Sequence, residues 1–187
     1  DNGDSGSVGT HASHHVFFLC LGKRREACYN KAHWTERRDF LRAVVTRVKE
    51  ASVKIEGEIC GQIETGYLIL LGIAPEDTAE DAAHLAEKIV HLRVFSDEAG
   101  KMNRALAEAN GSVLVISQFT LFADLKKRRP GFSKAAKPEI AIPLYEEFMA
   151  QLEARDVHVE RGEFGADMQV YSLNDGPVTL LFDTNEV

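Results

Sequence analysis

Apolar residues recur along most of the chain at the two-residue spacing of strands, and in two segments at the spacing of helices. Short apolar runs bounded by turn residues predict strands. Gly57 is expected to turn a hairpin between residues 53–55 and 59–61, and residues 174–177 are expected to form a turn between the last two strands. The predicted strands are residues 42–49, the hairpin at 52–63, 66–74, 94–95, 113–116, 157–160, 168–173 and 178–182.

The two helical segments lie between predicted strands. Asp77 or Thr78 is expected to cap the first helix, whose apolar stripe would consist of Ala82, Leu85, Ala86, Ile89 and Leu92. Pro138 suits the first turn of the second helix, in which Pro143 indicates an early kink or a later start. No βαβ alternation and no glycine-rich dinucleotide loop is recognisable. The pattern predicts an α+β domain with a largely antiparallel sheet and two main helices on one side.

Residues 1–40 differ from the domain that is expected to span residues 41–187. Residues 1–9 are rich in Gly, Ser and Asp, which favours disorder. The basic residues follow the apolar run 16–21 instead of preceding it, and acidic residues are present, so neither a signal peptide nor a transit peptide fits. We interpret the segment as an added extension or a remnant of protein expression, with an address or binding arm as the alternative. Its deletion is expected to leave activity intact.

Composition narrows the class of protein. Hydrophobic residues make up 44% of the 187 residues and charged residues 27%, which is typical of a globular domain. The net charge of −7 argues against non-specific coating of nucleic acid but not against binding the end of one RNA. Three widely spaced cysteines favour a reducing compartment, and we expect a cytoplasmic protein. No apolar run is long enough for a membrane helix, and without a CxxC or HExxH motif no metal or cofactor is expected.

The apolar run 113–116 ends in polar residues without an intervening Gly or Pro. Ser117, Gln118 and Thr120 place two hydroxyls and a carboxamide at the end of a core strand. Buried polar groups cost about 1–3 kcal/mol each when they lack a partner, so these groups need a neighbour or a ligand. Neighbouring backbone could satisfy them, and this stretch alone does not decide between the two.

Two further features have alternative interpretations. Lys126, Lys127, Arg128 and Arg129 form the densest positive cluster, which fits either a solvated loop or a contact for nucleic-acid phosphates. Cys60 is expected to be a small core residue of its strand, because no activating base is evident nearby.

Two motifs, complete and in order, connect the chain to a known family. They are Ser-Gln-Phe-Thr-Leu at 117–121 and Asn-Asp-Gly-Pro-Val-Thr at 174–179. With weaker matches around residues 42–45, 100–103, 132–134 and 164–170, the chain resembles the D-aminoacyl-tRNA deacylases, which hydrolyse the ester between a D-amino acid and tRNA. The resemblance covers almost everything beyond residue 41, where the family's start methionine would fall on Leu41. It implies a cofactor-free homodimer with active sites at the subunit interface.

The resemblance also implies roles for the first motif and its surroundings. Backbone N–H groups of Phe119 and Thr120 would stabilise the oxyanion, while Ser117 and Gln118 would hold the substrate amine or the ribose. The 2′-hydroxyl of the terminal adenosine would assist, so that Thr120 is not an obligatory nucleophile. The pocket for the 3′-terminal adenosine and aminoacyl group would be lined by Phe119, Met168, Phe164 and Ala141.

The second motif is implied to reject L-amino acids. In the family, the Gly176-Pro177 bond is cis and the pair enters the pocket of the other subunit, with Asn174 at the start of the motif. Backbone oxygens there would clash with an L side chain but admit a D side chain, and also glycine, a second candidate substrate. Arg47 would brace this pair, although its local sequence context alone indicates a solvated charge on an edge strand. A simple β-turn at 174–177 is the alternative.

Two other functions compete with this hypothesis. The first is a general small-molecule esterase with Thr120 as nucleophile, which would cleave simple esters without chiral preference. The second is a non-catalytic nucleic-acid-binding module that uses Lys126 to Arg129. The acidic net charge and the polar strand end argue against this module.

Overall fold

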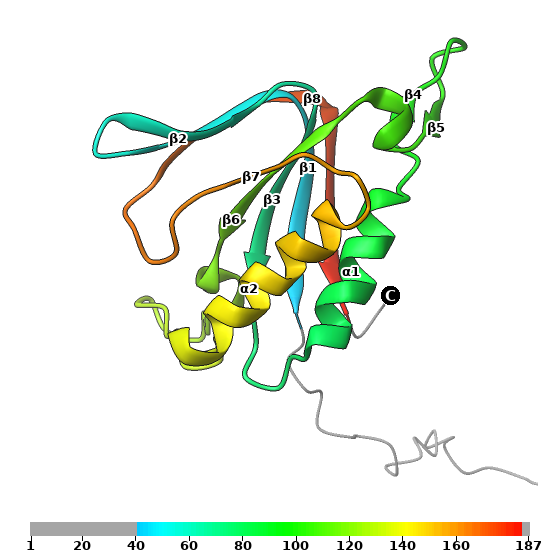
Figure 1. The fold of residues 1–187 in the computed structure, drawn as a ribbon. Coiled ribbons are helices and arrows are strands. Elements are labelled where there is room, and N and C mark those ends of the chain that lie inside the picture. Colours follow the sequence, from blue (N-terminus) through cyan, green and yellow to red (C-terminus); the bar gives the residue numbers. More distant parts are fainter. Residues whose placement is uncertain (1–40, 185–187) are drawn as a thin grey trace, which may run out of the picture. The chain divides into compact units, whose positions relative to one another are not determined.

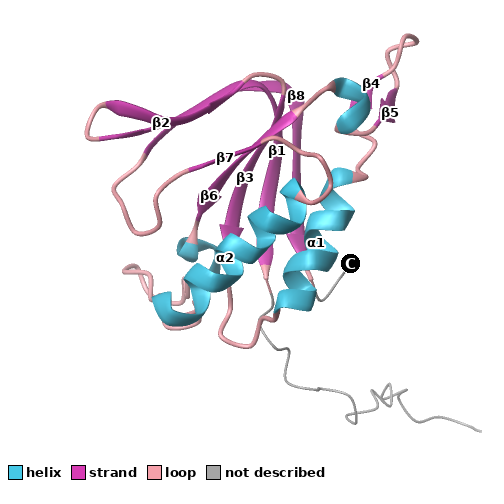
Figure 2. Cartoon of the chain, in the orientation of Figure 1, coloured by secondary structure: helices cyan, strands magenta, loops and turns pink. Residues whose placement is uncertain are grey.

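The structure, a computed structural model, describes residues 41–184; the prediction for residues 1–40 therefore lies outside the described part (Figures 1 and 2). Within these described residues, eight strands, two α-helices and two short 3₁₀ helices follow one another. In order they are β1 (Arg42–Ile55), β2 (Glu58–Ile63), β3 (Gly66–Gly72), α1 (Ala79–Val90), β4 (Phe95–Ser96), β5 (Met102–Arg104), η1 (Ala107–Ala109), β6 (Ser112–Ser117), η2 (Phe119–Phe122), α2 (Pro138–Glu153), β7 (Val159–Arg161) and β8 (Gln169–Asp183).

The main sheet is mixed, which corrects the expectation of a largely antiparallel one. Its order is β2-β1-β3-β6-β7, with β8 also paired to β1. Strand β1 is antiparallel to β2, β3 and β8, whereas β6 is parallel to both β3 and β7. Parallel neighbours need a crossover, and α1 and α2 provide the two crossovers here. The expected absence of βαβ units was therefore wrong, because the β4–β5 hairpin separates α1 from β6 and hides the first unit.

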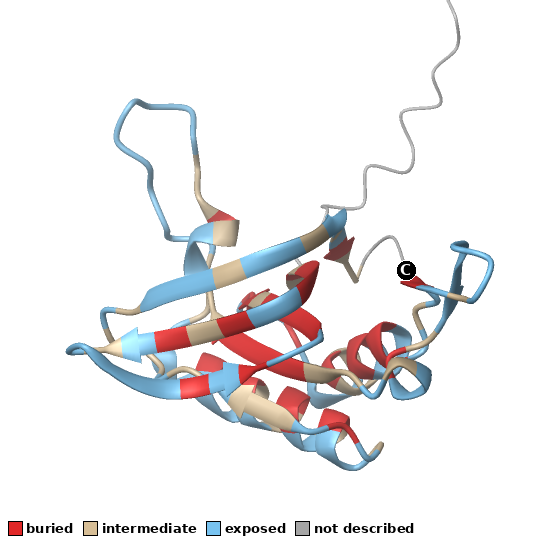
Figure 3. Ribbon diagram, turned by 90° about the horizontal axis from the view of Figure 1, so that it is seen from above, coloured by how far each residue is buried: buried red, intermediate tan, exposed pale blue. Residues whose placement is uncertain are grey.

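Both helices cover the same face of the sheet, as predicted (Figure 1). Alternate residues of the strands face them, such as Tyr67, Ile69 and Leu71 of β3, and these pack with the buried stripe of α1. A smaller core lies on the opposite face and includes Val53 and Leu114. Figure 3 shows that the buried residues gather between the sheet and the inward faces of the helices.

The helix boundaries follow their sequence signals. Thr78 caps α1, since its side chain accepts a hydrogen bond from the backbone of Asp81 while the Asp81 carboxylate accepts one from the backbone of Thr78. Helix α2 begins at Pro138 and continues through Pro143, so the later start is wrong. Pro143 lacks the N–H that would reach the carbonyl of Glu139, which is an exposed residue of the first turn.

Strand β8 replaces the two strands and the turn expected for residues 168–182. Its pairing with β1 jumps from Thr46–Thr179 to Val48–Asn174, so β1 advances by two residues while β8 covers five. Residues 175–178, hereafter the β8 bulge, therefore lie opposite Arg47. The chain does not reverse there, which rules out the simple β-turn.

The hairpin of β1 and β2 turns at Gly57 as predicted, but Cys60 does not enter the core. The register passes from Val53–Gly61 to Lys54–Ile59 and skips Cys60. Because Cys60 is the extra residue of this irregularity on an outer strand, its thiol is exposed, and the expectation of a core cysteine was wrong.

Candidate active site

The first motif forms a tight turn at the end of β6. Ser117 is the last residue of the strand, and Gln118 donates its backbone N–H to the Leu71 carbonyl at 2.7 Å. The 3₁₀ helix η2 follows, with Leu121 donating to the Gln118 carbonyl at 3.2 Å. Gln118 and η2, hereafter the η2 turn, are thus held against β3. Gly72 allows this approach, since a Cβ there would lie 3.0 Å from the Gln118 carbonyl oxygen.

The start of the η2 turn offers hydrogen-bond donors. Within residues 41–184, no acceptor is found for the backbone N–H groups of Phe119 and Thr120, and both residues are exposed. The Thr120 hydroxyl accepts a hydrogen bond from the Gln118 carboxamide. No His, Lys or carboxylate contacts that hydroxyl among the described residues, so a base that would activate it as a nucleophile is lacking there. The two N–H groups are suited to stabilising a developing oxyanion.

Five of the predicted site residues surround one small cavity of about 50 Å³. The cavity is lined by Leu71, Ile73, Ser117, Gln118, Phe119, Ala136, Ala141, Phe164 and Gly165. Phe164 is held by an edge-on contact with Tyr145, whose hydroxyl donates to the Val115 carbonyl at 2.8 Å. Burial raises the pKa of Tyr145 to about 12, so this hydroxyl keeps its proton and serves as a support for the wall.

Met168 does not line this cavity. Its side chain packs against the smaller core on the opposite face of the sheet. Its sulfur lies so close to Gly162 that a Cβ added to this glycine would be only 2.5 Å from it. The structure therefore separates Met168 from Phe164 and Ala141, although the family resemblance implied that all three line one pocket.

Arg47 is buried, with 7% of its surface exposed, and is not the solvated edge charge suggested by its sequence context. Its Nε donates to the Asp175 carbonyl oxygen at 3.2 Å and lies 3.1 Å from the Asp175 carboxylate. A guanidinium nitrogen also donates to the carbonyl of Val94. The residue thus connects the β8 bulge to the segment that follows α1.

The Gly176–Pro177 peptide bond in the bulge is cis, the geometry that the resemblance implied. Gly176 has a φ of +123°, and a Cβ there would be 3.0 Å from Arg47 Nη2. Only glycine fits this backbone at such close approach to the guanidinium. Asn174, Gly176 and Pro177 are exposed, so the bulge presents its backbone to the surroundings.

The two motifs lie far apart within one chain. Arg47, opposite the bulge, pairs with Tyr67, which pairs with Val113, whereas Ser117 pairs with Leu71, four residues further along β3. Four residues span about 13 Å, and the three strand spacings from β8 to β6 add about 14 Å sideways, which gives a separation of roughly 20 Å. One chain does not bring the bulge to the cavity.

The basic residues Lys126, Lys127, Arg128 and Arg129 are all exposed in a loop after η2. Asp124 and Gly131 close this loop through two backbone hydrogen bonds of 2.7 and 3.1 Å. Directly after it, Phe132 meets Phe119 edge-on, with ring centroids 5.1 Å apart. Phe132 was not assigned to the site from the sequence, although it begins one of the weaker matches to the family.

Residues 41–184 hold no cluster of three or more His, Cys, Asp or Glu side chains placed to bind a metal ion. In the same range, no helix is long and apolar enough to cross a membrane.

Comparison with known proteins shows the family of this chain. Residues 44–183 match the family model described as D-Tyr-tRNA(Tyr) deacylase, and the chain belongs to this family. A D-aminoacyl-tRNA deacylase of Thermus aquaticus is 59% identical over 147 residues, covering 78% of this chain and 97% of the relative. A D-aminoacyl-tRNA deacylase of Chloroflexus aurantiacus is 56% identical over 148 residues, covering 79% of this chain and 92% of the relative.

Solved structures agree with the fold. The c-Myc DNA Unwinding Element Binding Protein superimposes with a TM-score of 0.72 at 41% identity, over 76% of this chain and 97% of that one. A probable eukaryotic D-amino acid tRNA deacylase gives a TM-score of 0.68 at 17% identity, which shows a shared fold.

Proposed function

We propose that the protein hydrolyses the ester bond of D-aminoacyl-tRNA, releases the free D-amino acid and tRNA, and so removes mischarged tRNA before translation. Membership of the deacylase family is the observation that carries this proposal. The N–H groups at the start of the η2 turn, next to the cavity at Phe119, supply a suitable site within the described residues.

The reaction needs a positioned water and a place for negative charge. Water adds to the ester carbonyl carbon, and the electron pair moved onto the carbonyl oxygen is stabilised by the N–H groups of Phe119 and Thr120. Collapse of this intermediate breaks the bond to the ribose 3′-oxygen, which takes the proton given up by the water through the neighbouring 2′-hydroxyl. Ser117 and Gln118 hold the substrate amine or the ribose. No acyl-enzyme is proposed, because no base stands beside the Thr120 hydroxyl in the part of the chain that the structure describes.

The substrate's 3′-terminal adenosine is proposed to lie against Phe119 and Phe164, with Ala141 also lining the cavity. Met168, which the family resemblance placed in this pocket, packs on the opposite face of the sheet and is not proposed to contact the substrate from the same chain. Phosphates of the acceptor end would contact the exposed loop at Lys126, Lys127, Arg128 and Arg129. Such a protein would act in the cytoplasm, where tRNA is aminoacylated.

The active unit is proposed to be a homodimer in which the β8 bulge of one subunit enters the cavity of the other. The separation of roughly 20 Å within one chain supports this arrangement, because a bulge that acts on the cavity has to come from another copy. Strands β2 and β8 also expose apolar side chains that a second copy would cover, namely Ile59, Val170, Tyr171, Leu173 and Leu181.

Chiral selection then follows from backbone geometry. Arg47 holds the bulge at the Asp175 carbonyl, directly before Gly176 and next to Asn174 at the start of the motif. The Gly176-Pro177 carbonyls would then lie against the α-carbon of the substrate and leave no room for an L side chain. A backbone wall cannot change rotamer to admit the wrong enantiomer. Glycine has no side chain to exclude, so glycyl-tRNA is a proposed second substrate.

Deacylation of D-tyrosyl-tRNA and L-tyrosyl-tRNA, measured side by side with enzyme well below substrate, tests the proposal. We expect loss of the D ester with the L ester spared. Loss of both esters would support the proposed hydrolysis but contradict the proposed selection by Gly176-Pro177. Loss of neither would contradict the hydrolase and favour the nucleic-acid-binding module.

A further inference from the structure

The η2 turn is fixed at its far end by a residue outside both family motifs. The last carbonyls of a helical turn have no partner within it, and the Leu121 carbonyl accepts instead from Arg42 Nη1 at 3.1 Å. The same guanidinium lies over the ring of Phe122, with 4.8 Å between its central carbon and the ring centroid. Arg42 therefore holds η2 through both its backbone and its buried aromatic side chain.

Arg42 is itself held by Asp183. The two residues face each other across β1 and β8, and Arg42 Nε lies 3.1 Å from Asp183 Oδ2. With Nε directed to the carboxylate and Nη1 to the carbonyl, one guanidinium makes two bonds in different directions. A lysine has a single charged nitrogen and cannot make both bonds at these distances.

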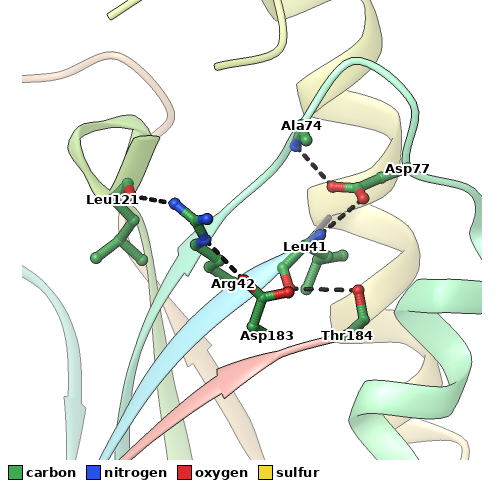
Figure 4. A network of polar contacts seen from close by, with 7 residues as sticks. All are labelled: Leu41, Arg42, Ala74, Asp77, Leu121, Asp183 and Thr184. Carbon is green, nitrogen blue, oxygen red and sulfur yellow. Dashed lines mark hydrogen bonds and ion pairs between the residues drawn. The ribbon is translucent and has the colours of Figure 1, made fainter. Parts of the chain in front are cut away.

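The pair belongs to a network that reaches the loop before α1 (Figure 4). Thr184, next to Asp183, donates its backbone N–H to the Leu41 carbonyl at 3.1 Å. Leu41 donates its own N–H to the Asp77 carboxylate at 2.7 Å, and Ala74 donates to the same carboxylate at 2.6 Å. The ends of β1 and β8 are therefore anchored where Arg42 leaves the sheet, so the guanidinium is presented from a fixed backbone.

We propose that Arg42, oriented by Asp183, is a positioning residue for the deacylation reaction. By holding the end of the η2 turn at Leu121, it fixes the position of the oxyanion-binding N–H groups of Phe119 and Thr120 at the start of the same turn. This role rests on the proposed function. Arg42 touches no reacting atom. Its effect follows because a short turn fixed at both ends cannot shift, and misplacement of catalytic groups by about 1 Å can cost about a hundredfold in rate.

The test compares steady-state deacylation of D-tyrosyl-tRNA with hydrogen exchange of residues 118–123 in the full-length protein. Arg42→Ala is expected to speed amide exchange in this segment and to lower kcat about 10- to 100-fold, with KM for the aminoacyl-tRNA changing less than about threefold. Arg155→Ala is the matched control. Its guanidinium has a similar side-chain exposure of 26%, against 30% for Arg42, and pairs with Glu87 away from η2.

Two conservative variants separate positioning from general stability. Arg42→Lys keeps the charge beside Asp183 but loses the bond to Leu121, so its kcat is expected to fall nearly as far as that of Arg42→Ala. Asp183→Asn keeps an oxygen that accepts from Nε, and most of the activity is expected to remain. These two variants also test the positioning role of Arg42 if Arg42→Ala fails to fold.

The outcomes are distinct from those of the proposed function. A wild-type protein that spares both tyrosyl esters contradicts the function, whereas the exchange measurement still decides whether Arg42 holds the turn. The inference is overturned if Arg42→Ala and Arg42→Lys exchange and react as Arg155→Ala does. It is also overturned if exchange rises in the turn while kcat stays unchanged.

Discussion

The η2 turn and the β8 bulge are the two motif-bearing parts of the domain, and they are built in opposite ways. The turn follows a fully buried part of β6 and packs its Phe122 into the molecule, with 1% of that residue exposed. The bulge leaves the register of its sheet, exposes Gly176 and Pro177, and has one buried support, Arg47. The turn is thus held by contacts within its own chain, whereas the bulge leaves its backbone exposed. On our account, the first part supplies the chemistry and the second supplies the selection.

The largest effect is expected from removing a donor at the turn. Thr120→Pro deletes the backbone N–H at a position where the side chain is exposed. Loss of one oxyanion donor typically lowers kcat by about 10²–10³. Thr120→Ala keeps the N–H and removes only the hydroxyl, so its kcat on D-tyrosyl-tRNA should stay close to that of the wild type. Equal losses in the two variants would make the hydroxyl, and not the amide, the group that matters.

A change at the bulge should alter selection instead of rate. Arg47→Ala leaves the carbonyls of Asp175 and Val94 without their donor and should lower the free energy of unfolding by about 2–3 kcal/mol. With the bulge loosened, cleavage of L-tyrosyl-tRNA should rise at least about tenfold, which corresponds to about 1.4 kcal/mol less discrimination, while cleavage of the D ester persists. Denaturant unfolding and paired deacylation assays measure the two effects; unchanged rejection of the L ester would refute the bracing role.

The basic loop is expected to contribute to substrate binding, and to neither the chemistry of the η2 turn nor the selection by the β8 bulge. Replacing Lys126, Lys127, Arg128 and Arg129 by Gln is expected to raise KM about tenfold at low salt and to flatten the dependence of KM on salt concentration, because each phosphate contact to single-stranded RNA contributes a slope of about 0.7. The value of kcat should not change. Lys88→Gln on α1 serves as the control for a simple change in net charge, and a salt dependence like that of the wild type would exclude the loop.

The smallest effect on activity is expected from a change at Asp77, which belongs to the hydrogen-bond network that supports the η2 turn. Burial raises the pKa of Asp77 to about 6, against the hydrogen bonds from Ala74 and Leu41, which lower it. A pKa above the usual value means that the folded state favours the protonated carboxyl. The stability from this group is therefore fully present below about pH 4 and is lost as the pH rises through 6, a change of about 2–3 kcal/mol. Asp77→Asn should remove this dependence in unfolding curves measured at several pH values; a dependence that persists would place its origin elsewhere.

The sequence predicted the local elements better than their arrangement. The hairpin at Gly57, the cap at Thr78 and the exposed loop at Lys126 to Arg129 follow from local chemistry and were confirmed. The parallel pairing of β6 was not predicted, because the direction of a strand depends on the path of the chain between strands and not on its own apolar pattern.

The site shows the same limit. The two motifs named the residues of the turn and of the bulge, and the family that the sequence suggested was confirmed by the family model. Arg47 and Arg42 illustrate what the motifs lack. Each is an isolated arginine in a strand pattern. The family resemblance assigned Arg47 to the bulge, and the fold adds that it is buried there, whereas only the fold shows that Arg42 lies against the turn. Long-range contacts of this kind leave no periodic signal in the sequence.

The most direct test of the account uses heterodimers made from two differently tagged chains. In the first, a Thr120→Pro chain is paired with an Arg47→Ala chain; in the second, a chain with both substitutions is paired with the wild type. If the bulge of one subunit selects for the turn of the other, the first heterodimer should cleave D-tyrosyl-tRNA and spare the L ester, whereas the second should cleave both. The opposite pattern would show that each chain uses its own bulge, and a purely monomeric active protein would contradict the shared site altogether.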